Sequence, residues 1–330
     1  MNFTLNILGT ASALPTMKRY PSAQVLDVRG RLFLFDCGEG TQMQMRRMRL
    51  SYLNIGTVCL SHLHGDHVFG IFGLLSTMAL MGRTAHLDIF APKDFGKVLK
   101  FWKTAFGDGM RFEAEHHVLS ADAPETVWES RNAELLAFPL NHRVEAYGFI
   151  LREKEPMPNV RKDAIEKYGL TIAEIATLKR GEDVVRPAGI DAEPGPENGF
   201  MRFSGGPEPL VINCREVTYR PYIPRSYAYC SDTAPFPRLH EWVRGVTLLY
   251  HEATFPEELS DMAAKTYHST ARQAAECARD AGAGRLLIGH YSSRYPDVSV
   301  FLKEAREIFP DTVLANEGDV IEVPLIKFSV

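Results

Sequence analysis

Three histidines and one aspartate lie within six consecutive positions, directly after an apolar run, in the segment CLSHLHGDHVFG. On an extended chain, His62 and His64 point to the same side and can share one metal ion. Gly65 lets the chain turn sharply, so that Asp66 and His67 face a second ion beside the first. Imidazole and carboxylate ligands without thiolate favour zinc, with Mn²⁺ or Fe²⁺ as alternatives. The segment therefore predicts a two-metal centre at the end of a buried strand.

Four local ligands cannot complete two coordination spheres, because zinc takes four or five donors. The missing donors must come from distant strand ends that the fold brings to the same edge. Three residues fit: His142 follows the strand LLAFPL, Asp232 ends the strand SYAYCSD, and His290 ends the strand RLLIGH. A carboxylate has two oxygens with which it can bridge a pair of ions, so Asp232 is the candidate bridge.

The remaining histidines differ in their surroundings. Four lie in loop or polar contexts and are expected to be surface residues: His86, His116, His117 and His240. His251, inside the apolar segment LLYHEATF, is expected to be a buried structural residue. His268 lies just before a helix, beside the helix-capping residues Ser269 and Thr270, and in such a loop it can act as a general acid.

The order of apolar segments predicts a layered α/β fold with sheet at the centre. Residues 1–60 are expected to form strands separated by turns, and the apolar segment VFGIFGLLSTMALM is long enough for a buried helix. Further along we expect a strand near 87–91, a helix near 93–106 and strands near 134–151. After residue 210 the alternation of strands and helices resumes.

The stretch from about 153 to 210 differs from the rest of the chain. It is rich in Lys, Glu, Pro and Gly and poor in bulky apolar residues, and it contains two short amphipathic segments, VRKDAIEKYG and TIAEIATLKRG, each ended by glycine. We expect an inserted arm here, with a plain surface loop as the alternative.

Composition excludes several classes of protein. With 330 residues, 45% of them hydrophobic, the chain can bury a full core, yet it has no 18-residue apolar run and no membrane span is expected. The N-terminus lacks the basic start of a signal peptide, and the five cysteines are scattered, so a reducing cytoplasm is expected. The net charge of −4 means that a nucleic-acid partner would need a local basic patch.

The motif HxHxDH, with His, Asp and His downstream, resembles the metallo-β-lactamase superfamily. Within it the chain is more narrowly similar to the ribonuclease Z family of tRNA 3′-processing endoribonucleases. The segments that carry this resemblance span nearly the whole chain in family order: LGTASALPTMKRYPS, FDCGEGTQMQMRRM, SHLHGDHVFGIFGLL, NHRVEAYGF, CSDT, HEATF, HST and GHYSSRY.

The resemblance implies a set of site residues. Two zinc ions per chain would be held by three sets of ligands: His62, His64 and His142; Asp66, His67 and His290; and the bridging Asp232. Paired metals lower the pKa of bound water, and Asp66 is the implied proton acceptor. His268 is the implied proton donor to the departing 3′ oxygen, and Glu252 of HEATF holds it in place.

The resemblance also implies the fold and the activity. It predicts one αββα four-layer sandwich domain over residues 1–330, with an inserted flexible tRNA-binding arm at about 153–210. The implied activity is zinc-dependent phosphodiester hydrolysis of precursor tRNA after the discriminator nucleotide, leaving a 3′-hydroxyl, by a cytoplasmic homodimer. Basic side chains for tRNA phosphates are available in the arm: Arg161, Lys162, Lys167, Lys179, Arg180 and Arg186.

Two alternatives stay open. One is a metallo-hydrolase of small thioester, lactam or cyclic phosphodiester substrates; the enzymes of this class that act on carbonyl substrates are expected to need neither a separate acid such as His268 nor a long arm. The other is an inactive, metal-free binding homologue, which the filled ligand positions argue against.

Overall fold

The structure is a computed structural model that describes residues 2–188 and 208–328. Contacts divide the chain into two units, Met1–Glu153 with Arg225–Pro324, and Lys154–Pro224 with Leu325–Val330. The segment expected as an arm therefore falls almost entirely within the second unit. Its Gly/Pro-rich part EPGPENG lies outside the described residues.

The first unit contains two seven-stranded sheets. In the first sheet β4 to β7 run parallel, so their carboxyl ends meet at one edge. Its strands, in spatial order, are β20 (Val320–Glu322), β1 (Phe3–Gly9), β3 (Ala23–Val28), β4 (Arg31–Phe35), β5 (Ile55–Cys59), β6 (Leu87–Ala91) and β7 (Ala114–Val118).

In the second sheet β15, β16, β17 and β19 are parallel, and β9 runs in the same direction because two antiparallel pairings separate it from β15. The order is β19 (Thr312–Leu314), β17 (Leu286–Gly289), β16 (Leu248–Glu252), β15 (Ser226–Cys230), β10 (Tyr147–Glu153), β9 (Ala133–Pro139) and β8 (Glu125–Glu129). A short parallel pair joins β2 (Ala11–Ser12) to β18 (Tyr291–Ser292).

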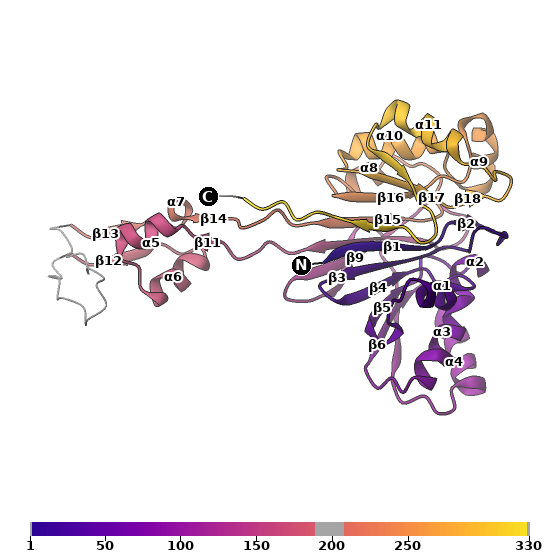
Figure 1. Cartoon of the computed structure of the whole chain (residues 1–330), viewed down its shortest axis with the longest axis horizontal. Helices are drawn as coiled ribbons and strands as arrows, with labels where there is room; N and C mark the ends of the chain where they lie inside the picture. Colours follow the sequence, from indigo (N-terminus) through magenta and orange to yellow (C-terminus); the bar gives the residue numbers. More distant parts are fainter. Residues whose placement is uncertain (1, 189–207, 329–330) are drawn as a thin grey trace. The chain divides into compact units, whose positions relative to one another are not determined.

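Three hydrophobic layers hold this unit together. One core lies between the sheets, and each sheet packs its other face against helices, as Figure 1 shows. The first sheet is covered by α1 (Thr41–Arg47), α3 (Gly70–Leu80) and α4 (Phe95–Phe106), and the second by α8 (Leu239–Trp242), α10 (Ala271–Ala281) and α11 (Ser299–Ile308). The remaining short helices are η1 (Tyr52–Asn54), α2 (Gly65–Val68), η2 (Glu257–Leu259) and α9 (Ser260–Thr266). This arrangement confirms the predicted αββα sandwich.

Helix α10 shows how local sequence sets these elements. Its alanines recur every three or four residues and are all buried, which makes one apolar stripe against the second sheet. Thr270 and Gln273 form a reciprocal capping box at its start, and Gly282 ends it in the left-handed conformation. Among the described residues no helix is both long and apolar enough to cross a membrane.

The second unit has a small core of its own, formed by Leu178, Ile212 and neighbouring apolar residues. Both predicted helices are present, as α5 (Lys162–Tyr168), which ends at Gly169, and α6 (Ile172–Lys179). With them lie α7 (Cys214–Val217) and two strand pairs, β11 (Asn159–Val160) with β14 (Thr218–Tyr219) and β12 (Val184–Arg186) with β13 (Leu210–Ile212).

Glu153, the last residue before the chain leaves the first unit, forms a buried ion pair with Arg225, the residue at which the chain re-enters it. The carboxylate of Glu153 accepts two hydrogen bonds from the Arg225 guanidinium, at 2.9 and 3.0 Å, and another from Arg29 at 3.1 Å. Burial by itself raises the pKa of Glu153, but its hydrogen bonds with Arg225 outweigh burial and hold the pKa below its ordinary value.

We expect Glu153→Gln to lower the free energy of unfolding by about 3 kcal/mol, because it leaves the buried Arg225 charge uncompensated. Since the folded-state pKa of Glu153 is depressed, its stabilisation is present above the ordinary glutamate pKa and is lost as the pH falls. The difference between wild type and variant in urea unfolding should therefore shrink in acid. The matched control Glu134→Gln, which removes the half-exposed pair with Arg152, should change stability by less than about 1 kcal/mol; equal effects would contradict the assignment.

Candidate metal centre

The strand topology brings the predicted site residues to one place. His62 follows β5, Asp232 follows β15, and His290 follows β17, all at the carboxyl ends of parallel strands. His142 follows β9, which ends at the same edge of the second sheet. The neighbouring loop carries the other three residues, with Asp66 and His67 in the short helix α2.

A first group of potential ligands contains His62, His64, His142 and Asp232, whose ligand atoms lie within 4.8 Å of one another. His62 Nε2 lies 3.0 Å from His64 Nδ1, which in turn lies 3.5 Å from His142 Nε2. Asp232 turns its Oδ2 atom toward this group, 3.6 Å from His62 Nε2 and 4.0 Å from His142 Nε2.

A second group contains Asp66, His67 and His290. Asp66 Oδ2 lies 3.4 Å from His67 Nε2 and 3.8 Å from His290 Nε2. The Oδ1 atom of Asp232 faces this group, 3.4 Å from His67 Nε2 and 3.2 Å from His290 Nε2. Asp232 therefore directs one carboxylate oxygen toward each group.

The donor set fits two metal ions. Donors held at 2.0–2.1 Å by a tetrahedral ion lie roughly 3.3 Å apart, close to most of these separations. The Nε2 atoms of His67 and His290 are buried without a hydrogen-bond partner, which a protein avoids unless something else binds there. Their Nδ1 atoms are anchored, by Asp36 at 2.7 Å and by Thr254 at 3.0 Å, as is usual for histidine ligands.

Charges around the site also favour a cation. Burial lowers the pKa of His67, but Asp232, Asp36 and Asp66 outweigh burial and raise it well above its ordinary value. Burial raises the pKa of Asp232, yet His290 and His67 hold it well below its ordinary value. The electrostatic field that holds a proton on His67 favours a metal cation in the same position, so metal binding should release protons.

Asp36 is a supporting residue that the sequence analysis did not single out. It is fully buried after β4, and it accepts hydrogen bonds from the backbone and side chain of Ser61, at 2.7 and 2.8 Å, and from the Tyr229 hydroxyl at 2.7 Å. Together with its contact to His67, these bonds fix the start of the metal-binding loop. The signal available in the sequence was a carboxylate ending the apolar strand RLFLF.

His268 lies beside both groups and is held by a carboxylate. Its Nδ1 atom is 2.8 Å from Glu252 Oε1 and 4.0 Å from Asp232 Oδ2. Burial lowers the pKa of His268, but the charge of Glu252 and the hydrogen bond to it outweigh burial and raise the pKa to about 9. Glu252 is fully buried and is fixed in turn by the backbone amides of Thr233 and Thr254.

His251, the neighbour of Glu252, is buried, as expected. Its Nδ1 atom lies 2.7 Å from the Glu252 carbonyl oxygen, and His251 belongs to no potential ligand group among the described residues.

Two residues of the site have left-handed backbone conformations: His290 has φ +62° and Asp36 has φ +54°. Left-handed conformations cost energy for residues other than glycine, so their presence here marks a site whose geometry is imposed by the surrounding fold.

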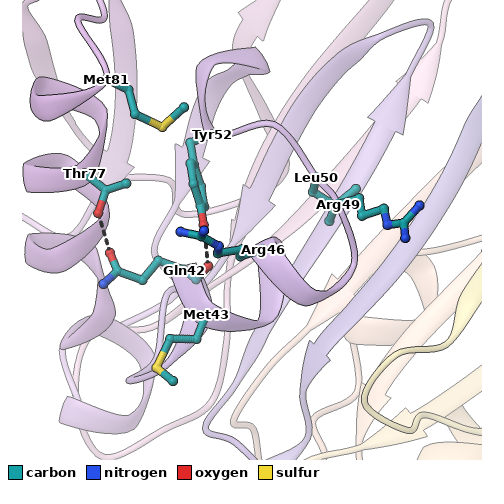
Figure 2. Close-up of a pocket in the computed structure, with 8 residues that line it drawn as sticks. All are labelled: Gln42, Met43, Arg46, Arg49, Leu50, Tyr52, Thr77 and Met81. Carbon is teal, nitrogen blue, oxygen red and sulfur yellow. Dashed lines mark hydrogen bonds between the residues drawn. The ribbon is translucent and has the colours of Figure 1, made fainter.

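A cavity of about 400 Å³ opens onto the two groups. Its lining contains Ser12, Ala13, Pro15, Pro21, Glu39, His64, Gly65, Asp66, Phe69, His142, Arg143, Asp232 and His268. A larger cavity of about 620 Å³ lies between α1 and α3, where Gln42 is hydrogen-bonded to Thr77 and Tyr52 (Figure 2). No histidine or carboxylate lines that larger cavity, so the smaller one is the candidate catalytic site.

Proteins of similar sequence are named ribonuclease Z. The chain is 40% identical over 316 residues to a protein named ribonuclease Z from Bacteroides fragilis, covering 96% of this chain and 97% of the relative. It is 41% identical over 315 residues to a ribonuclease Z from Porphyromonas gingivalis, covering 96% and 97%. A family model described as anti-Pycsar protein Apyc1 matches residues 3–152.

Solved structures share the fold. Human tRNase Z, short form, superposes with a TM-score of 0.67 at 24% identity, covering 97% of this chain and 99% of that one. The metallo-β-lactamase fold protein YhfI from Bacillus subtilis gives a TM-score of 0.65 at 16% identity, covering 98% and 100%. Unliganded yeast PDE1 gives 0.58 at 12% identity, covering 98% and 99%.

Proposed function

The chain belongs to the ribonuclease Z family, and we propose that it removes the 3′ trailer of precursor tRNA by hydrolysis after the discriminator nucleotide. The observation that carries this proposal is the His268–Glu252 pair beside two groups of metal ligands joined by Asp232. Hydrolysis of a thioester needs no such pair, because a thiolate leaves without a proton more easily than a ribose 3′ oxygen does.

We assign two zinc ions per chain to the site. The first would be held by His62, His64 and His142, the second by Asp66, His67 and His290, and Asp232 would contribute one oxygen to each. When bound, the pair supplies an activated water and positive charge for the phosphoryl oxygens. Asp66 is the proposed acceptor of the proton of the attacking water, because its carboxylate borders the cavity. Its Oδ2 atom also accepts a hydrogen bond from the backbone amide of Ala13 at 2.8 Å, which fixes the side chain in position.

His268 donates the proton that the departing 3′ oxygen requires. The Nδ1 atom is engaged by Glu252, which leaves Nε2 to carry the transferred proton. Glu252 keeps the ring in position and, through its charge, keeps it protonated at neutral pH. The alkoxide would otherwise be a poor leaving group.

We propose that the chain is one domain with an inserted arm at about 153–210, and that this arm corresponds to the second unit. We assign to it the binding of tRNA outside the cleavage site. Three of its basic side chains are paired with acids: Arg161 with Asp163, Arg180 with Glu182, and Arg186 with Glu174. Within the described residues three lysines have no ion pair and remain available to phosphates: Lys162, Lys167 and Lys179.

We also propose that the protein is a cytoplasmic homodimer. The five cysteines are free thiols, as in reducing compartments.

Helices α3 and α4 expose large apolar side chains to solvent: Leu80 is 89% exposed and Phe101 is 68% exposed. They lie beside a cavity lined by Phe72 and Trp102. A second copy of the chain is the proposed occupant, and Leu80→Asp with Phe101→Asp should convert a dimer to a monomer in light scattering.

The activity is tested with precursor tRNAs that differ only in whether CCA is encoded, by mapping the cut and the end group. We expect a cut directly after the discriminator nucleotide, with a 3′-hydroxyl on the tRNA product. The same preparation is assayed on a thioester, a lactam and a cyclic nucleotide. Turnover of one of these with no cleavage of precursor tRNA would refute the proposal.

A further inference from the structure

A further group of potential metal ligands lies outside the proposed catalytic centre, on strands β6 and β7. It consists of His86, Asp88, Glu115 and His117, whose ligand atoms lie within 4.8 Å of one another. Strands β6 and β7 pair in parallel with Asp88 opposite Glu115. Because side chains alternate along strands, residues two positions away from this pair lie on the same face. The register therefore puts His86 and His117 beside the two carboxylates.

The four side chains converge at distances that suit one ion. His86 Nε2 lies 3.2 Å from Asp88 Oδ1 and 3.3 Å from Glu115 Oε2, and His117 Nε2 lies 3.0 Å from the same Asp88 Oδ1. A tetrahedral ion with bonds of 2.0–2.1 Å separates its donors by roughly 3.3 Å. The Asp88 carboxylate uses its other oxygen, Oδ2, toward Arg31 at 3.7 Å.

Neighbouring residues restrain the group. The His117 ring stacks on Phe90 at 4.7 Å with an interplanar angle of 21°, which fixes its orientation. Thr57, the register partner of Asp88 on β5, lies on the same face, and its buried hydroxyl has no hydrogen-bond partner. A plain surface network of hydrogen bonds and ion pairs accounts for the two imidazoles at Asp88 Oδ1, but it leaves the buried Thr57 hydroxyl without a partner.

This group is separate from the proposed catalytic centre. His86 and Asp88 lie at the amino-terminal end of β6, whereas His62 follows the carboxyl end of the parallel strand β5. His117 lies on the edge strand β7, which β6 separates from β5, and the two groups share no residue.

We propose that His86, Asp88, Glu115 and His117 form a structural site for one divalent transition-metal ion. Two imidazoles and two carboxylates suit Zn²⁺, and the Irving–Williams order extends the site to Ni²⁺ and Cu²⁺. Strand β7 is the edge strand of the first sheet, so a bound ion would link this edge to β6. It would stabilise the folded protein by an amount that rises with the logarithm of the free ion concentration once that exceeds the dissociation constant.

The test compares zinc content per chain after dialysis of full-length protein against a buffer with fixed free Zn²⁺. Relative to wild type, the double variant His86→Ala/His117→Ala should lose one ion per chain, whatever the number bound elsewhere. Glu115→Gln, which preserves the size of the side chain, should weaken that ion at least tenfold, since even outer-shell changes cost about 10–100-fold. His240→Ala, which removes a half-buried imidazole from α8, should bind as much zinc as wild type.

Hydrolysis of a small chromogenic phosphodiester should be unchanged in the double variant, so failure of this proposal is distinguishable from failure of the proposed activity. Circular dichroism checks that each variant is folded, and if the double variant is not, Glu115→Gln decides. Equal zinc binding by wild type and Glu115→Gln would overturn the site, as would an equal loss in His240→Ala.

Discussion

Replacing Asp232 with alanine is expected to empty both halves of the candidate metal centre and to abolish phosphodiester cleavage. Its Oδ1 atom faces His67 and His290, and its Oδ2 atom faces His62, so one substitution removes a donor from each group. The buried histidines would also lose the negative charge that favours a cation beside them. We expect metal affinity to fall by more than about 100-fold, beyond the cost of losing an outer-shell partner.

The measurement is metal content by elemental analysis, alongside cleavage of precursor tRNA. Asp66→Ala serves as a comparison, because Asp66 belongs to one group and should release one ion per chain. Asp261→Ala, an exposed carboxylate in α9, is the control and should retain metal and activity. An Asp232→Ala protein with the metal content of wild type would contradict the bridging assignment.

Replacing His268 with alanine is expected to slow precursor tRNA cleavage by about 10²–10⁴-fold while metal content stays unchanged. His268 forms a potential ligand group with Asp232 and His290, but it lies outside the ligand sets assigned to the two ions, and its Nδ1 atom is hydrogen-bonded to Glu252. The loss should therefore reflect the missing proton for the 3′ oxygen rather than a missing ion.

A substrate with a better leaving group separates these causes. A nitrophenyl phosphodiester releases an anion that needs no proton, so His268→Ala should slow its hydrolysis far less than it slows tRNA cleavage. Glu252→Gln, which removes the charge that holds His268 protonated, should reproduce this pattern more weakly. Equal losses on both substrates, or a loss of bound metal, would refute the role of His268 as general acid.

Several parts of the structure follow from short stretches of sequence. His62, His64, Asp66 and His67 are close in sequence, so they stay close in space whichever residue ends the preceding strand. Helices α5 and α10 are bounded by residues that terminate helices for steric reasons, such as Gly169 and Gly282. Such features depend on neighbours within a few positions, which is why they could be predicted.

Other parts depend on contacts between distant segments. Asp36 contacts Tyr229 because the two sheets pack face to face, and it contacts His67 because β4 and β5 are neighbours in the first sheet. The sequence shows a carboxylate at the end of a strand but not these partners. His117 was expected in a surface loop or polar context, whereas it lies half-buried within β7 and shares one carboxylate oxygen with His86.

The sequence by itself indicated the candidate ligands of the catalytic metal centre and the layered α/β class, because ligand type, spacing and apolar periodicity are properties of local segments. Its resemblance to known proteins indicated the family. Only the tertiary structure decided which oxygen of Asp232 faces which histidines, and that His86 and His117, 31 positions apart, lie on one face. Strand register and packing set those relations, and both are properties of the whole fold.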